Sequence, residues 1–349
     1  MTHRENVLRA VRFEQPEYIP MVFHINAACW HHYDQHALQD LMEQHRFLFP
    51  HFMRQDCVTP VFGANERQSS PYTDPWGCVW ETTDDGIVGS VRHHPLAEWH
   101  DISTYRPPDP ALTDGMFPID WQAAIAEATK RKEQADLVYC ELPHGHTFLR
   151  LADIRGYENL LVDMSDGDFR LTSLIDMVQL FNEQVVLRRL DLGPDIMGYP
   201  DDLGMQQGPM IAPRHFRQYI KPLYQRLIRP ARDRGCVVHM HSDGDIRLLA
   251  EDLLDCGVDI INLQDRVNGI GWIAEHLAGR ICIDLDIDRQ HVTVRGTPKE
   301  IDDLILEEVR SLGGRQGGLM MIYGLYPGVP LRNVRALMDA MEKYSTFHS

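Results

Sequence analysis

Short apolar runs alternate with longer amphipathic stretches along most of the chain. Eight runs have the length and residue types of buried strands, and turn or helix signals bound them. They occupy 19–25, 57–62, 137–142, 195–199, 236–241, 259–264, 280–286 and 318–324. Helical periodicity follows between most of them, as at 157–164, 215–234, 245–256, 267–277 and 299–312. This alternation predicts an α/β protein with a parallel sheet.

Eight strands favour a single (β/α)8 TIM barrel spanning 1–349. The competing doubly wound sheet has no glycine-rich dinucleotide fingerprint to support it. Residues 65–130 interrupt the pattern with many Trp, Asp, Pro and His residues, so we expect an insertion there after the second strand, near the active-site mouth. Asp85-Gly86 predicts a hairpin within it. The capping boxes Thr2-x-x-Glu5 and Thr297-x-x-Glu300 predict two helix starts.

Composition narrows the classes of partner. The chain has 34 Lys and Arg against 51 Asp and Glu, a net charge of −17, which disfavours nucleic acid and anionic lipid as main partners. Seven widely spaced cysteines without a CxxC pair favour reduced thiols. Neither a signal-peptide core nor an 18-residue apolar stretch is present, so we expect a cytoplasmic protein.

Titratable and polar residues follow the predicted strands, and in a barrel the chemistry lies at those strand ends. We expect catalytic roles for Glu141, Asp202 and Tyr326, and substrate contacts from several neighbours. The expected substrate-binding residues are His24, Asn26, His144, His146, Tyr199, Gln206, Gln264, Asp284 and Tyr323.

His239-x-His241 is the sharpest feature of these strand ends. Residues i and i+2 of a strand point to the same side, so both imidazoles can reach one divalent ion, with Asp202 or Glu141 as a third ligand. The alternative is a structural pair, because a chain with 18 histidines produces such spacings by chance.

Two further alternatives concern neighbouring acids. Asp201-Asp202 is expected either to act as an acidic pair in metal binding or acid/base chemistry, or to have one member cap the next helix or loop while the other is solvated. Ser242 and Asp243 are expected to cap a helix that starts near Asp245. The histidines of the loop after the third strand are more typical of solvated residues than of catalytic ones.

Several segments, strongest from residue 140 onward, resemble the uroporphyrinogen decarboxylase superfamily over about 1–345. The segments are Tyr199–Pro213, Val238–Ile246, Gly257–Gln264, Arg295–Pro298 and Val329–Val334. The resemblance implies one TIM barrel with a cleft at the carboxyl ends of its strands. It also implies either cofactor-free decarboxylation of a porphyrinogen or zinc-assisted methyl transfer with a separate corrinoid protein. Related barrels often form homodimers.

The resemblance disfavours the decarboxylase itself. That enzyme has an arginine-rich loop after its first strand, whereas residues 24–33 here contain no arginine to grip carboxylates. In thiol-activating methyltransferases of the superfamily, zinc is bound by His-x-Cys and a later Cys. His239 matches the first ligand, His241 stands at the first Cys position, and no cysteine follows Cys282. Ligands without thiolate favour a stronger Lewis acid.

The preferred hypothesis is therefore a zinc-dependent methyltransferase acting on a small O- or N-methylated compound, with cobalamin on a partner protein. A second hypothesis is a metal-independent lyase that uses Asp202 and His241 on a smaller carboxylate. A third is a non-catalytic barrel, which the many titratable strand-end residues disfavour.

Overall fold

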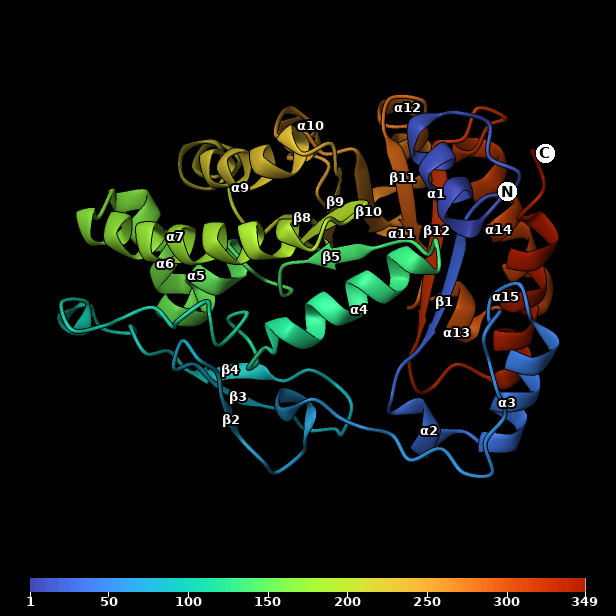
Figure 1. Ribbon diagram of the computed structural model, residues 1–349, viewed down its shortest axis with the longest axis horizontal. Helices are drawn as coiled ribbons and strands as arrows, with labels where there is room; N and C mark the ends of the chain where they lie inside the picture. Colours follow the sequence, from blue (N-terminus) through green and yellow to red (C-terminus); the bar gives the residue numbers. More distant parts are fainter. Residues whose placement is uncertain (349) are drawn as a thin grey trace. The chain divides into compact units, whose positions relative to one another are not determined.

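The computed structural model describes residues 1–348 (Figure 1). The chain divides into two compact units. Unit 1 comprises Met1–Gln68, Thr82–Val88 and Leu263–Ser349, and unit 2 comprises Ser69–Glu81 and Gly89–Asn262. Within the described residues no helix is long and apolar enough to cross a membrane.

Seven of the eight predicted strands are present in an α/β fold. They are β1 (Met21–Ile25), β5 (Tyr139–Glu141), β6 (Ile196–Pro200), β9 (Val237–Ser242), β10 (Ile260–Gln264), β11 (Cys282–Asp286) and β12 (Leu319–Leu325). Hydrogen bonding links them in the order β1-β12-β11-β10-β9-β6-β5, and β10 begins in unit 2 and ends in unit 1. The pairings of β1 with β12, β11 with β12, β5 with β6, and β6 with β9 are parallel.

The prediction of a strand at 57–62 is wrong, because this segment is irregular. The side chain of Gln35 takes the place of a neighbouring strand, since it accepts the amide of Val58 and donates to the Val58 carbonyl, both at 2.9 Å. Pro60 has no amide to donate, and Val61 is exposed. The described strand order thus ends at β1 and β5, and a closed eight-stranded barrel stays a prediction.

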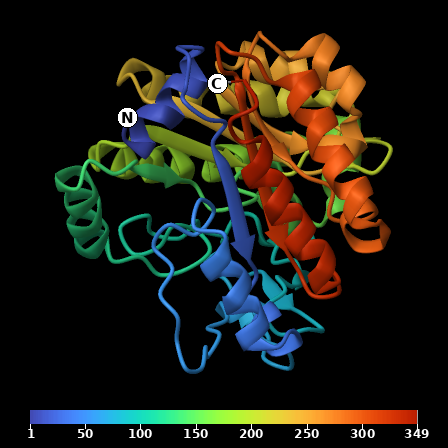
Figure 2. The same ribbon diagram turned by 90° about the vertical axis from the view of Figure 1, so that its right-hand side faces the viewer.

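Two helices of unit 1 begin where the capping boxes predict. Both capping boxes are present, at α1 (His3–Arg12) and at α14 (Pro298–Leu312). Helices α14 and α15 (Leu331–Tyr344) pack side by side and bury Leu304 and Leu337 (Figure 2). The remaining helices are α2 (Cys29–His32), α3 (Gln35–Gln44), η1 (Ala64–Glu66), α11 (Asp265–Asn268), α12 (Ile270–His276) and α13 (Val292–Arg295).

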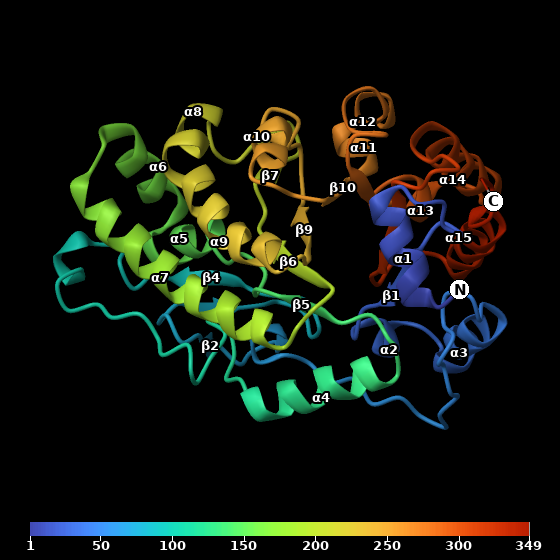
Figure 3. The ribbon, with the colours of Figure 1, turned by 45° about the horizontal axis from the view of Figure 1, so that its top comes forward.

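Helices of unit 2 cover its strands. Helix α7 (Phe169–Asp191) contacts both β5 and α9 (Lys221–Asp233), and α9 contacts β9 (Figure 3). All five residues of β6 are buried in succession, as expected for a parallel strand whose two faces are both covered. The other elements are α4 (Trp121–Glu133), α5 (Phe148–Arg155), α6 (Tyr157–Asp166), β7 (Gly204–Met205), β8 (Gly208–Pro209), α8 (Pro213–His215), the π-helical turn η3 (Phe216–Ile220) and α10 (Ala250–Asp255).

The irregular region 65–130 contains a small antiparallel sheet. Its strands are β2 (Tyr72–Thr73), β3 (Val79–Glu81) and β4 (Ser90–His93), followed by η2 (Trp99–Asp101). The predicted hairpin is confirmed, since β3 and β4 pair antiparallel and Asp85-Gly86 lies in their connection.

Asp74 fastens this sheet to α5. Its carboxylate is fully buried and accepts hydrogen bonds from Arg150 at 2.6 Å, from the Trp80 indole at 3.0 Å, and from the amides of Trp76 and Cys78 at 2.9 Å. Because each oxygen has two donors, the buried charge is fully satisfied. This small sheet is therefore fixed to α5, the helix that follows the turn carrying His144.

Candidate functional site

The strand ends of β5, β6 and β9 place the candidate chemistry within unit 2. Glu141 is in register with Gly198, Gly198 with His239, and Pro200 with His241. His239 and His241 are both half-buried and alternate with buried Val238 and Met240. The two imidazoles therefore lie on the same side of β9, as their spacing predicts.

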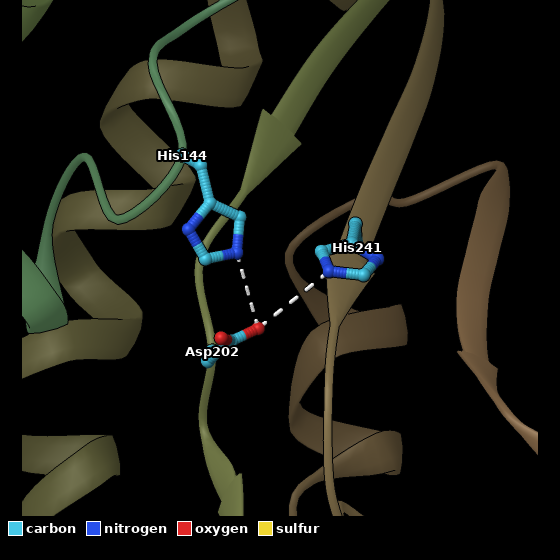
Figure 4. Close-up of side chains that lie close together, drawn as sticks. All are labelled: His144, Asp202 and His241. Carbon is cyan, nitrogen blue, oxygen red and sulfur yellow. Dashed lines mark hydrogen bonds and ion pairs between the residues drawn. The ribbon is translucent and has the colours of Figure 1, made fainter. Parts of the chain in front are cut away.

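Three side chains meet at these strand ends: His144 from the turn after β5, Asp202 directly after β6, and His241 on β9 (Figure 4). Their ligand atoms all lie within 4.8 Å of one another. Nε2 of His144 donates to Oδ1 of Asp202 at 3.3 Å, and Nε2 of His241 lies 3.6 Å from the same oxygen. Two imidazoles thus converge on one carboxylate oxygen.

Opposite charges are stabilised within this cluster. Burial acts to lower the pKa of His144, but its hydrogen bond to Asp202 and the charge of that carboxylate raise this pKa to about 9. Burial acts to raise the pKa of Asp202, but the hydrogen bond and charge of His144 lower it to about 2. The amide of Asp243 also donates to Asp202, at 2.8 Å. Asp202 is therefore held as a carboxylate that can bind a cation.

Asn262 orients His241. Its side-chain oxygen is hydrogen-bonded to Nδ1 of His241, so Nδ1 carries the proton and Nε2 faces Asp202. This is the arrangement that fixes the tautomer of a metal-binding histidine. Asn262 lies on β10 and was not among the predicted site residues.

Asp201 has a different function from its neighbour. Its buried carboxylate accepts the amides of Phe148 and Leu149 at the start of α5, and the Tyr224 hydroxyl at 2.6 Å. Burial raises the pKa of Asp201 to about 6, against the lowering effect of these hydrogen bonds. Asp201 therefore holds the start of α5, which precedes the pair in sequence, while Asp202 belongs to the cluster, so neither reading of the pair describes both residues.

His239 is not a member of the three-residue cluster. Its Nδ1 lies 2.7 Å from the hydroxyl of Tyr139 on β5. The structure thus brings His144, rather than His239, together with His241 and Asp202. Tyr139 was also absent from the prediction, although it is two residues before Glu141 and therefore shares its side of the strand.

Of the other four predicted residues of unit 2, two are buried and two are exposed. Tyr199 is buried on the helical side of β6, where its hydroxyl donates to the Leu227 carbonyl at 2.9 Å. His146 is also buried, and burial together with the charge of His144 lowers its pKa to about 3. Glu141 is exposed beside Gly198, and Gln206 is exposed in the β7–β8 connection.

Ser242 and Asp243 do not cap a helix near Asp245, so this expectation is wrong. Helix α10 begins only at Ala250. The Ser242 hydroxyl instead accepts the amide of Leu203 at 2.9 Å, and the amide of Asp243 is used by Asp202. Both residues therefore hold the ends of β6 and β9 together.

The predicted residues of unit 1 lie on or directly after β1, β10, β11 and β12. Asn26 donates to the Gly86 carbonyl at 3.0 Å and accepts the Ala28 amide at 2.8 Å, so it stabilises a turn. Burial lowers the pKa of His24 and the charge of Asp284 opposes this shift. Gln264 is half-buried at the end of β10 and Tyr323 is buried on β12. Tyr326 is exposed, with the Arg289 guanidinium over its ring.

Two acids at or just after the end of β11 have a cationic partner or amide donors. Asp286 pairs with Arg289 at 2.5 Å. Asp288 accepts the amides of His291 at 3.0 Å and Val292 at 2.5 Å at the start of α13. These contacts are structural in kind.

Known proteins show similarity to the chain in both sequence and structure. Two curated relatives match segments of it: methylcobamide:CoM methyltransferase MtaA of Methanosarcina barkeri is 22% identical over 155 residues, and uroporphyrinogen decarboxylase of Thermus thermophilus is 28% identical over 138 residues. These matches span 44% and 38% of this chain, and only 43% and 38% of the relatives.

A solved methyltransferase structure from Methanosarcina mazei aligns with a TM-score of 0.66 over 98% of each chain, at 15% identity, which supports the fold. The uroporphyrinogen decarboxylase (URO-D) family model matches residues 77–344. Because this match extends over most of the sequence, the chain belongs to the uroporphyrinogen decarboxylase family.

Proposed function

We propose that the chain is a metal-dependent methyltransferase that moves a methyl group between a small O- or N-methylated compound and a corrinoid protein. The observation that carries the proposal is the convergence of His144, Asp202 and His241. The matched relative from Methanosarcina barkeri, named as a methylcobamide:CoM methyltransferase, supports methyl transfer as the reaction class.

The three side chains fit a zinc ion. Two imidazoles and one carboxylate are a ligand set of catalytic zinc sites, in which a further position is left for water or substrate. The His144 side chain is 51% exposed, so the cluster is open to solvent on that side. When bound, zinc would act as a Lewis acid on an oxygen or nitrogen of the substrate.

Neighbouring residues prepare the cluster. Asn262 keeps Nε2 of His241 directed at Asp202, and the low pKa of Asp202 keeps its carboxylate ionised. Asp201 holds the start of α5, and the amide of Gly145 donates to the Pro200 carbonyl at 2.9 Å. Together these contacts fix the His144 turn against the end of β6.

The donor set favours an oxygen or nitrogen substrate over a thiol. The cluster contains no cysteine. Thiolate ligands donate charge and weaken the Lewis acidity of zinc, whereas imidazole and carboxylate preserve it. The cluster is therefore better suited to activate the leaving group of a methylated compound than to generate a thiolate acceptor.

Metal content measured by mass spectrometry tests the proposal. We expect about one zinc per chain in protein purified without chelator, and its loss in His241→Ala. His239→Ala should retain zinc, because His239 lies outside the cluster. His93→Ala is the matched control, since His93 is an exposed histidine on β4.

Two other outcomes of the zinc measurement would change the assignment. Loss of zinc in both His239→Ala and His241→Ala would restore the histidine pair predicted from sequence. A wild-type protein that binds no metal after zinc reconstitution would overturn the proposal. CO₂ release from a small carboxylate would then support the lyase, in which Asp202 and His241 serve as acid and base.

A further inference from the structure

A tyrosine and a histidine meet across the central strand of unit 2. Tyr139 on β5 and His239 on β9 are separated by β6, yet the Tyr139 hydroxyl lies 2.7 Å from Nδ1 of His239. Their rings are edge-on, with centroids 5.8 Å apart. The phenol therefore lies across the surface of the sheet.

Gly198 makes this crossing possible. It is the β6 residue in register with both Glu141 and His239. A Cβ atom at this position would lie 3.0 Å from Cζ of Tyr139 and 2.9 Å from Cβ of Glu141, and would overlap the Tyr139 hydroxyl. Since real Cβ atoms do not approach so closely, any larger residue would displace the phenol. The glycine thus provides the space in which Tyr139 reaches His239.

The hydroxyl of Tyr139 has a partner that differs from those of nearby tyrosines. The hydroxyls of Tyr157 and Tyr199 point at the carbonyls of Met210 and Leu227, which can only accept, so their protons are committed. An imidazole nitrogen can instead donate. When Nδ1–H of His239 donates to the Tyr139 oxygen, the phenolic proton can be given to another acceptor.

The Tyr139–His239 pair lies on the same side of the sheet as His241, a member of the cluster. His239 and His241 are two residues apart on one side of β9, which separates their Cα atoms by roughly 7 Å. Tyr139 is 40% exposed on this side, and Glu141 is exposed beside it. The Tyr139–His239 pair and His241 therefore project from the same side of these strands, which is the surface on which a substrate of the cluster would lie.

We propose that Tyr139 is the proton donor to the leaving oxygen of an O-methyl substrate, positioned by His239 across Gly198. This inference rests on the proposed function. The bond between methyl carbon and oxygen breaks, its electron pair stays on the oxygen, and the methyl group passes as a cation equivalent to the reduced corrinoid. The Tyr139 O–H bond breaks as the new alcohol O–H forms, and water reprotonates the phenolate.

This assignment selects a substrate class. An ether or aryl ether leaves as an anion, which a proton donor stabilises. A quaternary N-methyl compound leaves as a neutral amine and gains nothing from a proton. Tyr139 therefore favours methyl ethers with unactivated alcohol or phenol leaving groups.

Tyr139→Phe tests the proposal with Tyr157→Phe as the matched control. Zinc-loaded proteins would be assayed with chemically reduced cobalamin and two probes, anisole and 4-nitroanisole. We expect Tyr139→Phe to keep its zinc and to lose about 100-fold in turnover of anisole. The loss should be far smaller for 4-nitroanisole, because 4-nitrophenolate leaves without protonation. Tyr157→Phe should show no such dependence on the leaving group.

A binding measurement separates this proposal from the proposed function. Phenol is the product of anisole, and its dissociation constant should rise about tenfold in Tyr139→Phe, the loss of one hydrogen bond. Gly198→Ala should reproduce both effects with zinc retained, because the added Cβ displaces the phenol.

Equal behaviour of Tyr139→Phe and Tyr157→Phe on both ethers would overturn the role of Tyr139. If wild-type protein binds zinc but demethylates neither ether, the proposed function fails for aryl ethers. Phenol affinity then decides the role of Tyr139 by itself: a selective loss in Tyr139→Phe supports it, while equal affinities, or no phenol binding by the wild type, overturn it.

Discussion

The strand ends of the two units carry similar side chains with different partners. In unit 1, Asp286 pairs with Arg289 and Asp288 accepts backbone amides of α13. In unit 2, Asp202 faces the imidazoles of His144 and His241. A guanidinium or an amide is a fixed donor, whereas an imidazole can release its proton to bind a metal.

This difference shows that the partner, rather than the residue type, determines what a strand-end acid does. Even two consecutive residues differ, since Asp201 caps α5 and Asp202 belongs to the cluster. Asp288 has mainly amide donors, with the exposed His291 imidazole 3.5 Å away, whereas Asp202 accepts one amide, from Asp243, and lies beside two imidazoles.

The largest expected effect is a difference in the free energy of unfolding between variants of the two kinds of acid. Asp288→Ala should lower the free energy of unfolding by about 1–2 kcal/mol, because it removes a helix cap and leaves part-buried amides without their acceptor. The matched truncation Asp202→Ala should cost about 1 kcal/mol or less while abolishing zinc binding. Urea denaturation of both metal-free variants gives the comparison, and equal costs would contradict it.

A smaller effect is expected from the residue that orients His241. Asn262→Leu removes the acceptor of the Nδ1 proton and should weaken zinc binding by about 10- to 100-fold, because the ring loses its fixed tautomer and direction. Competition with a zinc-chelating dye measures this constant. Asn262→Asp, which keeps an acceptor at the same position, should retain tight binding, so a comparable loss in both variants would argue against an orienting role.

The smallest effect concerns an acid that lacks a close partner. Asp153 lies 3.9 Å from Arg150, and burial raises its pKa to about 7 despite that guanidinium. A raised pKa means that the folded state keeps the proton more tightly than the unfolded state, so its stabilisation is lost as pH rises through 7. Wild-type stability should fall by about 1 kcal/mol more than that of Asp153→Asn between pH 6 and pH 8. Parallel curves for the two proteins would show that Asp153 does not titrate in this range.

Local features were largely predictable from the sequence. The capping boxes, seven strands and the shared side of His239 and His241 all depend on residues close in the chain. The irregular segment 57–62 was mistaken for a strand, because Gln35 satisfies its backbone from another part of the chain.

The membership of the cluster was only partly predictable, because it also depends on contacts between residues far apart in the chain. His144 reaches Asp202 because Asp201 holds the first turn of α5, more than fifty residues away in sequence. Asn262 and Tyr139 follow the strand periodicity that identified their neighbours, but the register between strands decides which histidine each one contacts. That register is not encoded in the spacing of a single strand.

The attachment of the β2–β4 sheet through Asp74 has an evolutionary consequence. Its anchoring contacts are the buried ones made by Asp74, Trp80 and Arg150, while Glu81, Ser90 and Arg92 face outward and are exposed. Selection on the anchor is thereby separated from selection on the outer surface. New outward side chains can be acquired one at a time without loosening the sheet, so this part of the molecule can diversify while the parallel strands and their cluster stay the same.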